Sequence, residues 1–159
     1  MFRKILVPMD GSELAAKILP QVADLAKSQN AEVVLLTVGN VGSMVMAAEA
    51  VPSVVEEVYA SIKAAADANL GKIAAELRGQ GITASTVYRE GLPAQEVLKY
   101  SIEGGCDLIA MATHGRGEVA WVIGSVAEKV VTHATVPVLL LRVVEAQPIE
   151  KKRELFGGP

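Results

Sequence analysis

The sequence predicts an α/β protein in which five parallel strands form one open sheet with helices on both faces. Two observations predict this fold class. Runs of almost uninterrupted apolar residues alternate along the chain with longer segments of helical periodicity. Strands that are apolar at nearly every position are typical of a parallel sheet covered on both faces, because neither side of such a strand meets water. The chain has 159 residues, of which 51% are hydrophobic and 21% charged, and this suits one globular domain.

Five segments have the composition of strands. Ile5–Met9 and Val33–Val38 are apolar at almost every position, as expected for central strands. Ile82–Tyr88 is less apolar and more alternating, which predicts a position at an edge of the sheet. Leu108–Ala112 and Val136–Arg142 are again apolar and complete the predicted set.

Local signals mark the helices between these strands. Pro20 lies inside the first helical pattern, where its missing N–H and its ring predict a kink. Ser53 and Glu56 have the spacing of a capping box and are expected to open a long amphipathic helix. Pro93 suits the first turn of the next helix, and Gly104 suits its C-terminal cap.

Charge and composition exclude several classes of protein. A net charge of -3 argues against general nucleic-acid binding, which needs a basic face. The longest uncharged segment, Val33–Ala48, is too short for a membrane span and contains glycines. Arg3 and Lys4 are followed by too few apolar residues before Asp10 to form a signal peptide. The lone Cys106 fits a reducing compartment. We therefore expect a soluble, cytoplasmic protein that binds neither nucleic acid nor membrane.

A glycine-rich segment between the fourth strand and the last helix predicts an anion site. The segment contains Gly115, Gly117 and Gly124 and leads into a helix that is expected to begin at Ser125. The first N–H groups of a helix have no intrahelical partner, and the helix dipole adds roughly half a positive charge there. This arrangement favours a phosphate group, and therefore a nucleotide.

Asp10 is the candidate for the opposite end of such a ligand. In an open α/β sheet, ligands gather outside the carboxyl ends of the strands, where the strand order reverses. If the first and fourth strands are neighbours, Asp10 faces the glycine-rich segment across one cleft. A carboxylate accepts hydrogen bonds from ribose hydroxyls or a base amino group and repels phosphates, so Asp10 is expected at the nucleoside end.

The same residues also have purely structural interpretations. Ser125 and Glu128 have the spacing of a capping box, so Ser125 is expected to cap the last helix, although a capping hydroxyl can also meet a phosphate. Asp10 has the alternative role of capping the first helix. Gly115 and Gly117 have the alternative role of forming a tight turn without touching a ligand.

Other signatures of nucleotide enzymes and metal sites are absent from the sequence. It contains neither a P-loop lysine motif nor a dinucleotide fingerprint after the first strand. No His, Cys, Asp and Glu cluster has the spacing of a metal site. His114 has no acid or nucleophile partner in the sequence, which favours a structural role over catalysis. Mg²⁺ held mainly by the phosphates is compatible with this composition, since it needs few protein ligands.

Several segments, taken together and in this order, resemble the universal stress protein family from Lys4 to Arg142. These segments are Ile5–Ser12, Arg89–Pro93, Asp107–Gly117, Gly124–Val131 and Pro137–Leu141. The resemblance implies a Rossmann-like sheet with strand order 3-2-1-4-5 and a homodimer. Members of the family that carry the motif Gly-x2-Gly-x9-Gly-Ser/Thr bind ATP.

The chain departs from that motif at two places. Ala112 stands at the first glycine, and eight residues instead of nine separate Gly115 from Gly124. The N–H of an alanine can still donate, but its methyl group narrows the approach of a phosphate. Gly117 is expected to absorb the shortening, because glycine permits a positive φ.

The resemblance implies a set of nucleotide-binding residues. The backbone of Val38 is expected to read the adenine edge, with Met111 packed on the base. N–H groups of Gly115, Ser125 and Val126, and the Ser125 hydroxyl, are expected to donate to the phosphates. The complete expected set is Pro8, Met9, Asp10, Val38, Met111, Ala112, His114, Gly115, Arg116, Gly117, Gly124, Ser125 and Val126.

The sequence thus favours a regulatory, stress-response protein that binds ATP or AMP and is not an enzyme. Two alternatives remain: a dimeric interaction module without nucleotide binding, and a slow ATPase, for which no convincing general base is visible. We expect one domain over residues 1–143, a tail over residues 144–159, and a homodimer built on the fifth strand, with pairing concentrated at Val138–Val143 because Pro137 lacks a donor.

Overall fold

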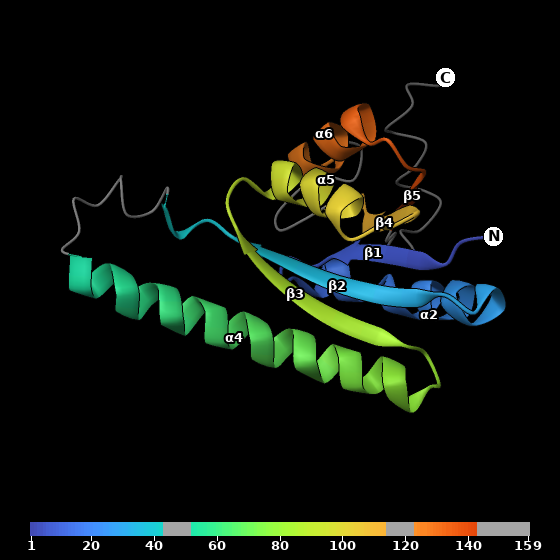
Figure 1. Cartoon of the computed structure of the whole chain (residues 1–159), viewed down its shortest axis with the longest axis horizontal. Coiled ribbons are helices and arrows are strands. Elements are labelled where there is room, and N and C mark those ends of the chain that lie inside the picture. The colour runs from blue at the N-terminus through green and yellow to red at the C-terminus, as the bar shows by residue number, and fades with distance from the viewer. Residues whose placement is uncertain (43–51, 114–122, 143–159) are drawn as a thin grey trace, which may run out of the picture.

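Five parallel strands form one sheet. They are β1 (Lys4–Pro8), β2 (Glu32–Gly39), β3 (Ala84–Glu90), β4 (Leu108–Ala112) and β5 (Val138–Leu141). Their order across the sheet is β3–β2–β1–β4–β5 (Figure 1), which confirms the predicted fold class, the strand order and the edge position of β3. The computed structural model describes residues 1–42, 52–113 and 123–142.

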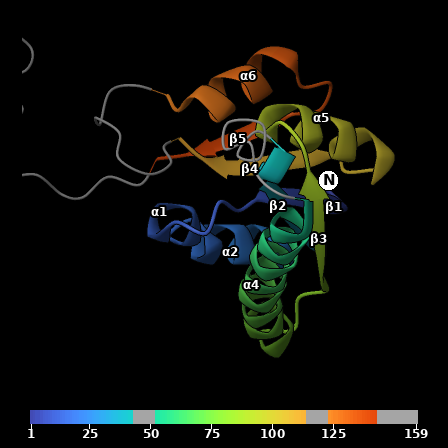
Figure 2. The ribbon, with the colours of Figure 1, turned by 90° about the vertical axis from the view of Figure 1, so that its left-hand side faces the viewer.

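Helices cover both faces of the sheet. The helices are α1 (Glu13–Ala16), α2 (Leu19–Gln29), α4 (Pro52–Gly79), α5 (Pro93–Glu103) and α6 (Ser125–His133). Figure 2 shows α5 and α6 on one face and α1, α2 and α4 on the other. None of the helices in the described part of the chain combines the length and the apolar composition that a membrane span requires.

Alternate residues of the central strands enter two separate cores. Ile5 and Val7 of β1 are buried in the core beneath α2 and α4, where they join Leu70. Leu6, between them, is buried in the core beneath α5 and α6, where it joins Val97. Because side chains of a strand alternate between its faces, a strand buried on both sides is apolar at every position, which is the pattern seen in the sequence.

Pro20 does not kink one helix as predicted but lies in the first turn of a second one. α1 ends at Ala16, and α2 begins at Leu19, so that Pro20 is the second residue of α2. The first N–H groups of a helix have no intrahelical acceptor, so a residue without an N–H is tolerated there.

The capping box at Ser53 was a wrong prediction, whereas the two signals for α5 are confirmed. α4 begins at Pro52, which places Ser53 inside the first turn instead of at the cap. Proline at the first position suits a helix start by itself, because its φ is already helical. Pro93 opens α5, and Gly104 is the C-terminal cap of that helix.

Strand β2 continues past the end of β1. The register of β1 and β2 ends with Pro8 opposite Leu36, whereas the register of β2 and β3 continues to Gly39 opposite Glu90. Among the described strands, the last residues of β2 therefore have a neighbour on the β3 side alone. This overhang lies at the carboxyl edge of the sheet, where ligands of open α/β folds bind.

Candidate functional site

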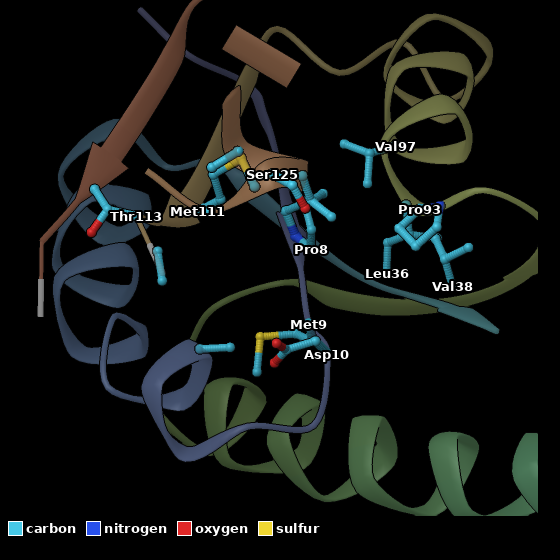
Figure 3. A pocket seen from close by; sticks show the side chains of 15 residues that line it. Pro8, Met9, Asp10, Leu36, Val38, Pro93, Val97, Met111, Thr113 and Ser125 are labelled. Carbon is cyan, nitrogen blue, oxygen red and sulfur yellow. The ribbon is translucent and has the colours of Figure 1, made fainter. Parts of the chain in front are cut away.

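A pocket of about 210 Å³ lies at the carboxyl ends of β1, β2 and β4 (Figure 3). It brings together nine residues that the sequence had singled out, from four separate segments of the chain. These residues are Pro8, Met9, Asp10, Val38, Met111, Ala112, Gly124, Ser125 and Val126. The lining residues that sequence reasoning missed are Ala15, Leu36, Pro93, Val97, Thr113 and Ala127.

The remaining predicted residues fall in a part of the chain that the structure does not describe. His114, Gly115, Arg116 and Gly117 belong to residues 114–122, which lie outside the described ranges. Within the ranges that are described, no group of three or more His, Cys, Asp and Glu side chains is placed to hold a metal ion.

The pocket has an apolar end. Leu36, Val38, Pro93 and Val97 gather on one side of it, where the end of β2 meets the start of α5 (Figure 3). Met111 lies next to Ser125, on the side of the pocket away from this group. An apolar end of this kind suits the flat ring of a base.

The loop after β1 presents Asp10 to the pocket. The Ser12 N–H donates to Asp10 Oδ1 over 2.8 Å, and Ser12 Oγ accepts the Ala15 N–H over 3.1 Å. Ser12 is therefore the side chain that caps α1, and the expected alternative role of Asp10 as that cap is wrong. The second carboxylate oxygen of Asp10 has no hydrogen-bond partner within the described ranges and remains available at the exposed rim.

The start of α6 forms the opposite wall. Gly124 is the N-cap, so Ser125 is the first helical residue, and no side chain makes a capping hydrogen bond there. The predicted capping role of Ser125 is therefore wrong. The Gly124 N–H donates to the Thr113 carbonyl over 2.8 Å, which fixes the helix start to the end of β4. The N–H groups of Ser125, Val126 and Ala127 have no acceptor among the described residues, as is usual in a first turn.

The part of β2 that extends past the end of β1 adds a polar feature to the apolar end of the pocket. The Met9 N–H donates to the Leu36 carbonyl over 2.8 Å, and the Gly91 N–H donates to the Gly39 carbonyl over 2.9 Å. Backbone groups of alternate residues point to opposite sides of a strand, so the N–H and C=O of Val38 point, like those of Leu36, toward the β1 side. There β1 has already ended, and neither group of Val38 has a partner among the described residues.

A polar cluster beside the pocket was missed by the sequence analysis. Tyr88 Oη donates to Glu90 Oε1, and Glu90 Oε2 accepts the Val41 N–H over 3.2 Å. Burial of the Tyr88 ring, together with its hydrogen bond to Glu90, raises the pKa of that hydroxyl above its ordinary value. Both side chains lie across Gly39, where a Cβ atom would collide with them. The cluster therefore holds the chain as it leaves β2.

Thr37 is a second feature that sequence reasoning missed. Its hydroxyl donates to the Met9 carbonyl over 2.9 Å and so joins β2 to the loop that carries Asp10. The available signal was a single hydroxyl side chain near the end of the apolar run Val33–Val38. Polar residues in buried strands generally have a specific hydrogen-bond partner.

Two structures that share this fold were solved with nucleotides. One is a universal stress protein family protein from Arabidopsis thaliana with AMP bound; it has a TM-score of 0.66 at 17% identity and covers 89% of this chain and 92% of that one. The other is a universal stress protein in complex with cAMP, with a TM-score of 0.66 at 18% identity, covering 90% of this chain and 98% of that one. At these identities the likeness shows the fold alone.

Relatives with higher sequence identity match this chain over most of its length. Universal stress protein YxiE of Bacillus subtilis is 34% identical over 150 residues, which cover 89% of this chain and 100% of the relative. The structure of protein MJ0577 of Methanocaldococcus jannaschii has a TM-score of 0.80 at 28% identity and covers 92% of this chain and 99% of that one. The model of the universal stress protein family matches residues 1–142. The chain therefore belongs to the universal stress protein family.

Proposed function

We propose that the protein is a regulatory, stress-response protein that binds ATP or AMP in the pocket at the carboxyl ends of β1, β2 and β4. The observation that carries the proposal is the arrangement of three kinds of group around one pocket. N–H groups without an acceptor among the described residues, and a hydroxyl, lie at the start of α6; an apolar wall is formed by the end of β2 and the start of α5, and Asp10 lies at the rim.

This arrangement matches the parts of a nucleotide in order. The first turn of α6 and Ser125 Oγ donate to the phosphates. Asp10 accepts hydrogen bonds from the ribose hydroxyls through Oδ2, which has no partner among the described residues. The base packs between the apolar residues at the end of β2, with its polar edge against the N–H and C=O of Val38.

The structures with AMP and cAMP support a nucleotide as the ligand class, since they share this chain's fold. Ala112 lines the pocket and also packs against the core beneath α2 and α4, so its methyl group is partly directed away from the pocket. A methyl group in place of the first motif glycine is therefore compatible with a bound nucleotide. Mg²⁺, where present, is held by the phosphates, because few protein ligands are needed.

Regulation, and not turnover, is the proposed role. Efficient phosphoryl transfer needs a positioned water and strong cationic stabilisation of the γ-phosphoryl group. No acid–base pair lies among the described lining residues, where Asp10 is the only titratable side chain. The proposal also includes a cytoplasmic location and a homodimer paired through β5.

The direct test is calorimetry with ATP and AMP on the purified chain and on Ser125→Ala. Loss of a hydrogen bond to a charged phosphate removes roughly 1.5–3 kcal/mol, so we expect about ten- to hundredfold weaker ATP binding. Thr132→Ala, at the far end of the same helix and outside the pocket, is the matched control and leaves the affinity unchanged.

Three outcomes would contradict the proposal. Absence of ATP and AMP binding, and of nucleotide in the protein purified without added ligand, would favour the interaction module. Unchanged affinity of a folded Ser125→Ala variant would remove the assignment of the phosphate end. Turnover within the usual enzyme range of roughly 1–100 per second would make the protein an ATPase.

A further inference from the structure

The hydroxyl of Thr37 donates to a carbonyl that would accept a backbone N–H if the ladder between β1 and β2 continued. In a parallel ladder, a residue that bonds to the next strand donates its N–H to the carbonyl of the residue that precedes its partner. Its own carbonyl accepts the N–H of the residue that follows that partner. Leu36 is opposite Pro8 and accepts the Met9 N–H over 2.8 Å, as this rule requires. The same register, continued by two residues, would direct the Val38 N–H to the Met9 carbonyl.

That continuation does not form. The Met9 carbonyl accepts the Thr37 hydroxyl over 2.9 Å instead, and the Val38 N–H has no acceptor among the described residues. The pairing of β1 with β2 ends at Pro8, although β2 runs on to Gly39 against β3. Thr37 thus supplies a hydrogen bond to the Met9 carbonyl without drawing Val38 into the ladder.

We propose that Thr37 is a positioning residue that keeps the Val38 N–H available to the base of a bound nucleotide. The inference rests on the proposed function and concerns one end of the same pocket. Val38 lines that pocket, whereas Thr37 does not and is half-buried behind it. Thr37 therefore acts through the backbone and does not itself touch the ligand.

The proposed ligands ATP and AMP carry adenine, and the backbone of Val38 suits this base. The N–H and C=O of Val38 point to the same side of β2 and offer one donor beside one acceptor. Adenine presents the complementary pair, an acceptor at N1 beside its 6-amino donor. Guanine presents a 6-oxo acceptor and an N1–H donor, so both of its groups would oppose those of Val38.

The end of β2 that carries Thr37 is held on its β3 side by the Tyr88–Glu90 pair. Glu90 accepts the Val41 N–H over 3.2 Å, and the Gly39 carbonyl accepts the Gly91 N–H over 2.9 Å. With the β3 side of the overhang fixed, the backbone groups of Val38 stay directed toward the β1 side. Removal of the Thr37 hydroxyl leaves the Met9 carbonyl in need of a donor, and the Val38 N–H is the nearest replacement in the ladder.

The test is a thermodynamic cycle between one protein group and one ligand atom. ATP and 1-deaza-ATP, which lacks the N1 acceptor, are titrated calorimetrically into the unaltered chain, Thr37→Val and Thr37→Ser. We expect the unaltered chain to prefer ATP by about fivefold, the size of one neutral hydrogen bond. Thr37→Val should bind the two ligands equally, and Thr37→Ser should restore the preference because it returns the hydroxyl.

Thr86→Val, on the exposed side of β3, is the control for the loss of a threonine hydroxyl and should keep the preference. If Thr37→Val does not fold, as judged by thermal unfolding, Thr37→Ala takes its place. Equal weakening of both ligands, no change in either, or no recovery with Thr37→Ser would assign Thr37 a structural role and overturn the inference. Lack of ATP binding by the unaltered chain would instead overturn the proposed function, and the inference with it.

Discussion

Asp107 precedes β4, and its carboxylate binds the backbone at the start of β1. Its Oδ1 accepts the N–H groups of Arg3 over 3.1 Å and Lys4 over 3.0 Å, and its Oδ2 accepts the Arg3 N–H over 2.9 Å. Burial acts to raise the pKa of this carboxyl group, but the hydrogen bonds from the backbone of Lys4 and Arg3 outweigh it and lower the pKa below its ordinary value. The charged form of Asp107 therefore stabilises the fold.

Asp107→Asn should lower the free energy of unfolding at pH 7 by about 1 kcal/mol, which is below the roughly 1.5–3 kcal/mol of a charged hydrogen bond because the group is partly solvated. Since the folded-state pKa is lowered, this contribution is complete above the unfolded value of about 3.9 and is lost as the pH falls through the folded-state pKa. Urea unfolding from pH 7 to pH 3 measures both effects. Asp24→Asn, on the exposed side of α2, should show neither, and a difference that grows toward acid pH would contradict the assignment.

At the residue scale, the sequence predicted which side chains meet at the pocket better than it predicted their local roles. Asp10 and Ser125 both line the pocket, yet Ser125 is not the cap that its spacing suggested, and the alternative of Asp10 as a cap is wrong as well. The cap is Ser12 in one case and Gly124 in the other, because the cap is defined by the backbone angles at which the helix starts. A sequence pattern does not fix those angles to within one or two residues.

The junction of β2, β3 and α4 is organised by one tyrosine. The Tyr88 ring contacts Tyr59 of α4 edge to face at 6.3 Å, and the Lys63 ammonium lies 5.6 Å from the centre of the Tyr88 ring. The hydroxyl of Tyr88 bonds to Glu90 across Gly39. The absence of a side chain at Gly39 therefore lets one ring join the helix to the end of β2.

Gly39→Ala should destabilise the protein by about 1–3 kcal/mol, the usual range for overpacking, because the new methyl group displaces Tyr88 and Glu90. Denaturant unfolding measures the loss. The same change in a Tyr88→Val background should be clearly smaller, since the obstructing ring is absent and the two sites are coupled. Equal effects in both backgrounds would show that Tyr88 is not the obstruction.

At the element scale, strand positions were predicted to within two residues, whereas strand neighbours were not predictable from composition. Apolar runs mark buried strands, and alternation marked the edge strand β3. These patterns report how much of a strand meets water, and not which strand lies beside it. The correct order came from the family resemblance. Thr37 was missed for the same reason, because its partner Met9 is identified only when β1 and β2 lie side by side.

At the scale of the whole molecule, the two edges of the sheet differ. β3 carries exposed or half-exposed polar residues, including Ser85 and Thr86, and α4 packs along it (Figure 1). β5 is apolar throughout, and its side chains are half-buried. The Ile109 N–H donates to the Pro137 carbonyl and the Thr113 N–H donates to the Leu141 carbonyl, so these odd-numbered residues of the β5 segment face β4. The backbone groups of Val138 and Leu140 therefore point away from the sheet.

An apolar edge with outward N–H and C=O groups can be completed by a second copy of itself, so we predict a homodimer paired through β5. Val138→Pro removes one outward donor without touching the ladder to β4, and should therefore yield a folded monomer at micromolar concentration. Val138→Ala truncates the side chain but keeps the N–H, and should remain dimeric. Sedimentation velocity, with circular dichroism to verify folding, separates these species by mass. A monomeric unaltered chain would refute the dimer, and a dimeric Val138→Pro variant would place the interface elsewhere on the molecule.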